Sequence, residues 1–74
     1  MGKIYVIQAS TDKGKTWINI MLEGGIVCHD MKRVAKDRME DLYQYFKKEF
    51  KRLNVKPIAR RWYRIKEYVE VQEW

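Results

Sequence analysis

Hydrophobic and polar residues alternate in two stretches near the start of the chain. Lys3 to Ser10 and Lys15 to Leu22 are both rich in β-branched and aromatic side chains, which favour strands. The Thr-Asp-Lys-Gly run at residues 11–14 is typical of a turn, because Asp bonds to its own following backbone and Gly accepts a positive φ. The pattern predicts a β-hairpin in which Thr11 pairs with Lys15.

This register predicts which side chains lie on each face of the hairpin, because side chains alternate along a strand. One set is expected to face the core: Ile4, Val6, Ile18, Ile20 and Leu22. The other set lies on the opposite face and contains two large aromatic side chains: Tyr5, Ile7, Trp17, Asn19 and Met21. A sheet covered on one face only would leave those aromatic side chains to solvent or to a partner.

Residues Met31 to Leu53 follow the period of an α-helix. Asp30 is expected to cap its start, Asn54 suits the left-handed position after its last turn, and Pro57 prevents its continuation. Charged side chains lie opposite an apolar arc that should pack on the sheet. That arc contains Met31, Val34, Ala35, Met39, Leu42, Tyr45, Phe46, Phe50 and Leu53.

A third extended segment follows, from Ile58 to Gln72. Its apolar positions shift between even and odd numbers, which a β-bulge or a short break near Lys66 and Glu67 would explain. The element order is β-β-α-β, and a right-handed crossover through the helix places the last strand beside the first. We therefore predict an α+β fold in one domain, residues 1–74, with a three-stranded antiparallel sheet of order 2-1-3 and one long helix packed on one face.

Composition narrows the class of protein. A chain of 74 residues with 46% hydrophobic and 35% charged residues fits one small globular domain. The longest mainly apolar stretch, Trp17 to Leu22, is far shorter than the roughly 18 residues that a membrane span needs, and no leader opens the chain. The single cysteine, Cys28, fits a reducing compartment. We expect a cytoplasmic protein that does not enter a membrane.

One cluster, Cys28-His29-Asp30, contains chemically versatile side chains. Adjacent residues seldom point at one another, Asp30 is needed as a cap, and cysteine often serves as a small apolar residue. A zinc site needs about four ligands, whereas the chain has one cysteine and one histidine. No glycine-rich nucleotide-binding motif is present. We expect no enzyme activity, metal, cofactor or small-molecule substrate.

The net charge of +6 is concentrated between Lys32 and Lys66, a segment with thirteen basic and four acidic residues. It contains the basic aromatic run Arg-Arg-Trp-Tyr-Arg, in which guanidinium groups suit phosphates and aromatic rings suit base stacking. If its even-numbered side chains share the face of Tyr5 and Trp17, arginines and aromatic rings form one surface. This predicts a surface for DNA or RNA made of Arg60, Arg61, Trp62, Tyr63, Arg64, Lys47, Lys51 and Lys56.

Two other interpretations of these residues are open. In one, Trp62 or Tyr63 fills the core, and the lysines of the helix complement the negative C-terminal end of its dipole. In the other, Tyr5, Trp17 and Met21 form a protein interface of an adaptor, inhibitor or homodimer. No family signature is present, but a short basic chain of this kind looks like the small products of phages and mobile elements. That likeness is one of general character and of no motif, and it adds only slightly to the case for a host-directed inhibitor.

Overall fold

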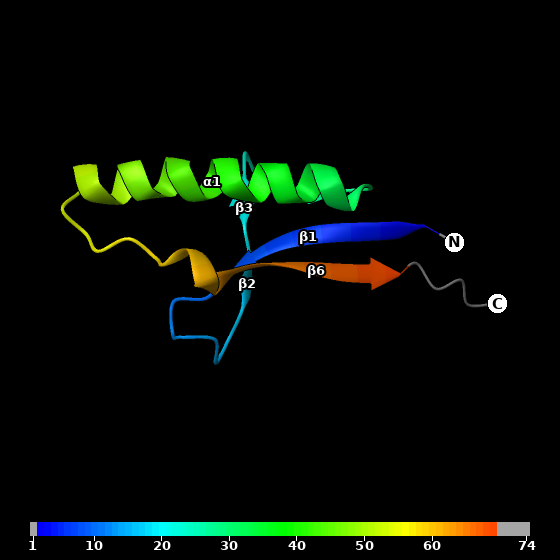
Figure 1. Cartoon of the computed structure of the whole chain (residues 1–74), viewed down its shortest axis with the longest axis horizontal. Helices are drawn as coiled ribbons and strands as arrows, with labels where there is room; N and C mark the ends of the chain where they lie inside the picture. Colours follow the sequence, from blue (N-terminus) through cyan, green and yellow to red (C-terminus); the bar gives the residue numbers. More distant parts are fainter. Residues whose placement is uncertain (1, 70–74) are drawn as a thin grey trace.

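The computed structural model describes residues 2–69 and has one long helix on one side of a small antiparallel sheet (Figure 1). Strand β1 (Lys3–Ala9) is central. Strand β6 (Tyr63–Val69) pairs with its whole length on one side. Strands β2 (Ile18–Asn19) and β5 (Cys28–His29) pair with its two halves on the other side. The α+β class, the antiparallel pairing and the sheet order 2-1-3 are confirmed.

The second predicted strand is split by an inserted hairpin. Strands β3 (Met21–Leu22) and β4 (Gly25–Ile26) pair only with each other in a separate two-stranded sheet. The chain leaves β1 after Ile20, whose N–H donates to the Ile7 carbonyl at 3.0 Å, and returns at Val27, whose carbonyl accepts the Ile7 N–H at 3.3 Å. The backbone hydrogen bonds on this side of β1 therefore continue from β2 to β5, although the inserted hairpin separates these two strands in the sequence.

The register of the first hairpin is one residue away from the predicted one. Gln8 pairs with Asn19 and Ala9 with Ile18, so residues 10–17 form the connection instead of a four-residue turn. The longer connection is held by hydrogen bonds that the side chains of Ser10 and Asp12 make within it, and the turn composition does not predict them. A shift of one residue exchanges the two faces of one strand relative to the other.

The predicted faces of the first strand are consequently wrong. Ile7 is fully buried in the cluster under the helix, whereas Ile4, expected in the core, is 46% exposed. Alternation places Tyr5 on the same face as Ile7, facing the helix. Val6 is buried as well, but on the face opposite the helix.

The second strand agrees with its predicted faces more closely. Ile20 is buried in the core cluster and Leu22 packs against it. Ile18 is on the same face but is 57% exposed. Trp17 and Asn19 lie on the opposite face, as predicted, whereas Met21 belongs to β3.

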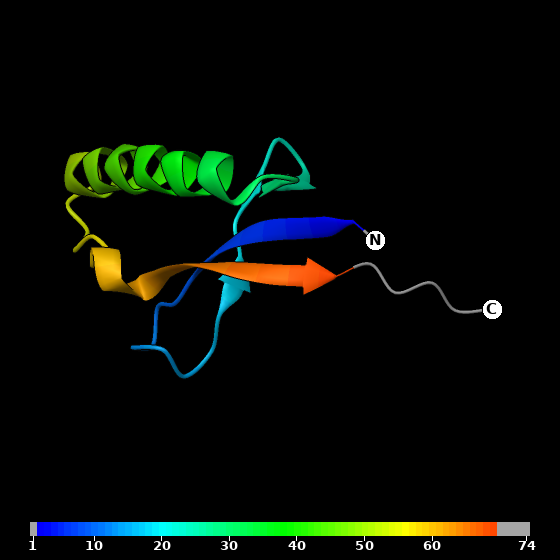
Figure 2. The same cartoon turned by 45° about the vertical axis from the view of Figure 1, so that its right-hand side comes forward.

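Helix α1 (Lys32–Arg52) lies along one side of the sheet in both views of the molecule (Figures 1 and 2), and its Leu42 is buried in the same cluster as Ile7. Ala35 and Leu42 are its buried residues, and Met39 and Phe46 pack around them. Some of the predicted apolar arc is exposed instead: Met31, Val34, Tyr45 and Leu53. Tyr43, which the arc omitted, packs on the core.

The predicted cap is present at the C-terminal end of α1 but not at its N-terminal end. Met31, and not Asp30, occupies the N-cap position, and no side chain caps this end. At the other end, Asn54 has a φ of 62°, and the Val55 N–H donates to the Phe50 carbonyl at 2.8 Å. This bond is the one that defines a Schellman cap, so the prediction for Asn54 is confirmed.

The last strand is shorter than predicted and has no bulge within residues 63–69. A short 3₁₀ helix, Arg60–Trp62, precedes β6. Pairing then runs without interruption from Ala9 with Tyr63 to Lys3 with Val69. The even-numbered aromatic residues do not belong to the core face of the strand, because Trp62 lies in the 3₁₀ turn and Tyr68 is 45% exposed on the face of Ile4. Predicted strand residues 70–72 lie outside the described part of the chain.

No helix in the described part of the chain combines the length and the apolar character needed to cross a membrane.

Candidate nucleic-acid interface

The loop at residues 10–17 is organised by two polar side chains. The buried Ser10 hydroxyl donates to Asp12 Oδ1 at 2.7 Å and accepts the Gly14 N–H at 2.8 Å. Asp12 also accepts the N–H of Thr16 at 2.9 Å and its hydroxyl hydrogen. The Ser10 N–H donates to the Trp62 carbonyl at 2.8 Å, which ties the loop to the start of β6.

These bonds make the loop sensitive to acid. The Thr16 hydroxyl bond, followed by the Thr16 N–H and Ser10 bonds, lowers the pKa of Asp12 to about 2. Because the folded pKa lies below the unfolded one, this carboxylate stabilises the fold above the ordinary value of 3.8 and loses that effect as the pH falls toward 2. We expect the tryptophan fluorescence of Trp17 and Trp62 to change over this interval.

An Asp12→Asn variant is the control for that titration. Its fluorescence should stay flat between pH 4 and pH 2, apart from any global unfolding that circular dichroism detects. An identical transition in the variant would mean that another carboxyl group controls the loop.

The side chains of Trp17 and Trp62 both lie beside Gly14 of this loop. A Cβ atom at Gly14 would lie 3.0 Å from Cζ3 of Trp62 and 3.8 Å from Cζ2 of Trp17. Gly14 has a φ of 88°, which side chains rarely tolerate. The glycine therefore supplies both the turn and the space that lets the indoles of Trp17 and Trp62 lie against it.

Each indole carries an arginine on its face. The guanidinium carbon of Arg64 lies 4.2 Å from the centre of the Trp17 ring, and that of Arg61 lies 5.6 Å from the Trp62 ring. Contacts of this kind fix the direction of an arginine and still leave N–H groups for a ligand. Trp17, Arg61, Trp62 and Arg64 are called the indole–arginine cluster below.

A row of polar side chains across three strands positions Arg64. Arg64 Nε donates to Gln8 Oε1 at 2.8 Å, and Gln8 Nε2 donates to Asn19 Oδ1 at 2.8 Å. The three residues are directly opposite one another in the sheet register. Gln8 is only 6% exposed, and these bonds satisfy its amide.

A depression of about 590 Å³ adjoins Trp62, where the loop, the segment after α1 and the 3₁₀ helix meet. Its charged lining consists of Lys13, Lys56 and Arg61, all exposed, and no carboxylate lines it. We call it the basic depression. Three cations beside an aromatic ring form a site that suits a polyanion with planar groups.

Several residues of the predicted surface have other roles. Tyr63 is 7% exposed, and its ring packs edge-on to Tyr43 with the centroids 5.6 Å apart. Desolvation in this position raises the pKa of Tyr63. Arg60 forms an ion pair of 2.7 Å with Glu40 on the helix. Stacking of Tyr63 on a base is therefore incompatible with the fold, and the side chain of Arg60 is already paired.

The 3₁₀ helix explains this division within the basic aromatic run. Residues 60–62 do not alternate as strand residues would, so Arg60 faces Glu40 on α1 while Arg61 and Trp62 line the basic depression. Lys56 lines the depression too, whereas Lys47 and Lys51 do not. Lys47 lies over the Tyr43 ring on the helix, 5.8 Å from its centroid.

The alternative protein interface is not one surface. Tyr5 faces the helix and donates to Glu67 at 3.2 Å, Trp17 lies under Arg64, and Met21 is 60% exposed in the inserted hairpin. The shifted register separates Tyr5 from Trp17, and the insertion separates Met21 from both. The three residues therefore do not share one face of a hairpin as predicted, while their role in a protein interface stays a prediction.

Lys13 and Gln8 also belong to the candidate site, although the sequence did not point to them. The sequence around Lys13 and Gly14 indicates only a turn. A glutamine within a strand, such as Gln8, does not indicate which side chain it will bond to. Both join the site through contacts with residues about 50 positions away in the chain. A contact of that range leaves no trace in local composition.

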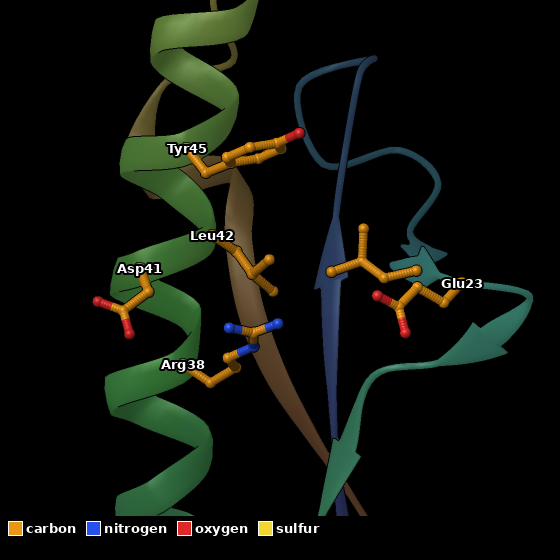
Figure 3. Close-up of a pocket in the computed structure, with 6 residues that line it drawn as sticks. Glu23, Arg38, Asp41, Leu42 and Tyr45 are labelled. Carbon is orange, nitrogen blue, oxygen red and sulfur yellow. The ribbon is translucent and has the colours of Figure 1, made fainter.

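Another depression, of about 460 Å³, lies between α1 and the inserted hairpin. Figure 3 shows Arg38 extending from the helix toward the hairpin that carries Glu23, with Tyr45 above and Asp41 pointing away. Its lining contains charges of both signs, which makes it a poorer match for a polyanion than the basic depression.

The cysteine and histidine of the versatile cluster do not converge. Cys28 and His29 are consecutive residues of β5, so alternation sends their side chains to opposite faces. Within residues 2–69, no three side chains of His, Cys, Asp or Glu come together as a metal site.

Comparison of the chain with family models, with curated proteins and with solved structures found no match.

Proposed function

We propose that this protein is a non-enzymatic nucleic-acid-binding module whose contact surface is the basic depression and the adjoining indole–arginine cluster. The observation that supports this most directly is the lining of the depression by Lys13, Lys56, Arg61 and Trp62 with no carboxylate among them. The single reduced cysteine fits a place in the cytoplasm, where such a ligand is abundant.

Phosphate groups are the proposed ligands of the three cations. Lys13, Lys56 and Arg61 come from three separate segments, so they can contact neighbouring phosphates of one strand from different sides. Neutralising phosphates releases bound counterions, and the affinity should therefore fall steeply as salt rises.

A base is the proposed ligand of the Trp62 ring. Trp62 is half-buried, so its indole is held in place while part of it is accessible from the depression. Base–aromatic stacking contributes about 1–3 kcal/mol and needs an unpaired base, which favours single strands over duplexes. Arg64, fixed over Trp17, extends the basic surface onto the face of the sheet opposite the helix.

The test measures fluorescence anisotropy of labelled single-stranded and double-stranded oligonucleotides at ~50 mM salt and above. Arg61→Ala should weaken binding and reduce the slope of log affinity against log salt by about 0.7–0.9. Trp62→Ala should weaken single-strand binding about 5- to 100-fold, while Trp62→Phe retains most of it.

Arg33→Ala is the matched control, because it removes an exposed arginine from the opposite end of the helix. It should leave the affinity within about twofold of the parent. Absence of binding at ~50 mM salt, or an equal loss for Arg33→Ala and Arg61→Ala, would refute the proposed surface.

A further inference from the structure

The outer edge of β6 is an unpaired strand edge within residues 2–69. β6 pairs with β1 over seven consecutive positions and with no other described strand. Neither a bulge nor a proline interrupts it. An open edge of this length is a template for pairing with another extended segment.

The register identifies the backbone groups that face outward. The Ser10 N–H bonds to the Trp62 carbonyl, so the even-numbered residues 64, 66 and 68 direct their backbone groups toward β1. The hydrogen bonds of Ile7 support this assignment, because its N–H and carbonyl bond to Val27 and Ile20 on the other side of β1. The N–H and carbonyl groups of Ile65 and Glu67 therefore point away from the sheet.

Positive charge flanks this part of the edge on both faces. Lys66 is exposed on the face opposite the helix. On the helix side, the charge of Lys32 reaches Glu67, and Lys36 follows one turn later. Glu67 is itself paired with Lys3 at 3.3 Å. The exposed charges beside Ile65 are therefore mainly positive, with Lys66, Lys32 and Lys36 outnumbering the paired carboxylate of Glu67.

Symmetric pairings of a second copy of this chain about Ile65, Lys66 or Glu67 are unfavourable. Symmetric antiparallel pairing about Lys66 sets two lysines opposite each other, and pairing about Ile65 sets Arg64 opposite Lys66. Pairing about Glu67 sets two glutamates opposite each other. Like charges directly opposite across a strand pair are destabilising.

We infer that the β6 edge binds an acidic, extended peptide segment of another protein as an additional strand. Its backbone bonds to Ile65 and Glu67, and its carboxylates lie beside Lys66 on one face and beside Lys32 and Lys36 on the other. This site is separate from the basic depression, so the inference does not depend on nucleic-acid binding.

The probe is an acetylated and amidated ten-residue peptide of alternating valine and glutamate, with a valine–lysine peptide as its counterpart. Amide hydrogen exchange by NMR should show selective protection of the Ile65 and Glu67 amides by the acidic peptide. Lys66→Gln should weaken binding, and Arg61→Ala should not change it. Protection elsewhere, or equal binding of the basic peptide, would overturn the inference.

Glu67→Pro is the most direct test, because it removes one outward-facing N–H of the edge. Proline is tolerated at such a position of an edge strand, where the N–H faces solvent. Glu67→Pro should reduce affinity about tenfold or more, whereas Glu67→Ala, which keeps the N–H, should bind the acidic peptide at least as well as the parent. Circular dichroism verifies that both variants fold. Undiminished binding by folded Glu67→Pro, or a stable dimer in sedimentation that Glu67→Pro disrupts, would exclude the acidic strand.

Discussion

Replacing Ile7 with alanine is expected to lower the free energy of unfolding by about 2–5 kcal/mol. Ile7 is 0% exposed and lies in the cluster formed with Ala9, Ile20, Leu42 and Tyr63. A chain of this length has a total stability of roughly 4–11 kcal/mol, so this loss is a large part of the whole. Urea unfolding followed by circular dichroism measures it.

Ile4→Ala is the matched control, because it removes the same atoms from the same strand. Ile4 is 46% exposed on the opposite face, and we expect a loss below about 1 kcal/mol. The pair distinguishes the observed register from the one predicted by alternation, in which Ile4 faces the core and Ile7 does not. A larger loss for Ile4→Ala than for Ile7→Ala would contradict the observed register.

The helix and the sheet order were predictable because their signals are local. The period of residues 31–53 identifies α1 within one residue at each end, and Asn54 forms the cap that its residue type favours. The crossover rule then determines the order 2-1-3. The register of β1 with β2 depends instead on the length of the loop between them. Hydrogen bonds of Ser10 and Asp12 stabilise the observed loop of residues 10–17.

The candidate site was predictable in composition but not in detail. Arg61, Trp62 and Lys56, which the charge and aromatic pattern singled out, line the basic depression, and their contact with nucleic acid stays a prediction. Tyr63 has the same local signal as Trp62, yet it starts β6 and points to the core. One turn of 3₁₀ helix separates their roles, and no feature of the run Arg-Arg-Trp-Tyr-Arg specifies that turn.

Gly14 connects the fold to the proposed function, and Gly14→Ala is the second substitution with a large expected effect. At a φ of 88°, alanine should cost about 1–2 kcal/mol in backbone strain. The new methyl group would also lie 3.0 Å from the Trp62 ring, which must then move. We expect lower stability together with weaker binding of single-stranded oligonucleotides, measured by urea unfolding and by anisotropy.

Gly24→Ala separates these two causes. Gly24 has a similar φ of 81°, but a Cβ there would meet no atom within 4 Å. Its strain should therefore cost about the same 1–2 kcal/mol, while oligonucleotide affinity stays at the parent value. The displaced indole then accounts for whatever affinity Gly14→Ala loses beyond Gly24→Ala. Equal affinities in the two variants would show that the position of the Trp62 ring does not matter for binding, and base stacking would have to be removed from the proposed function.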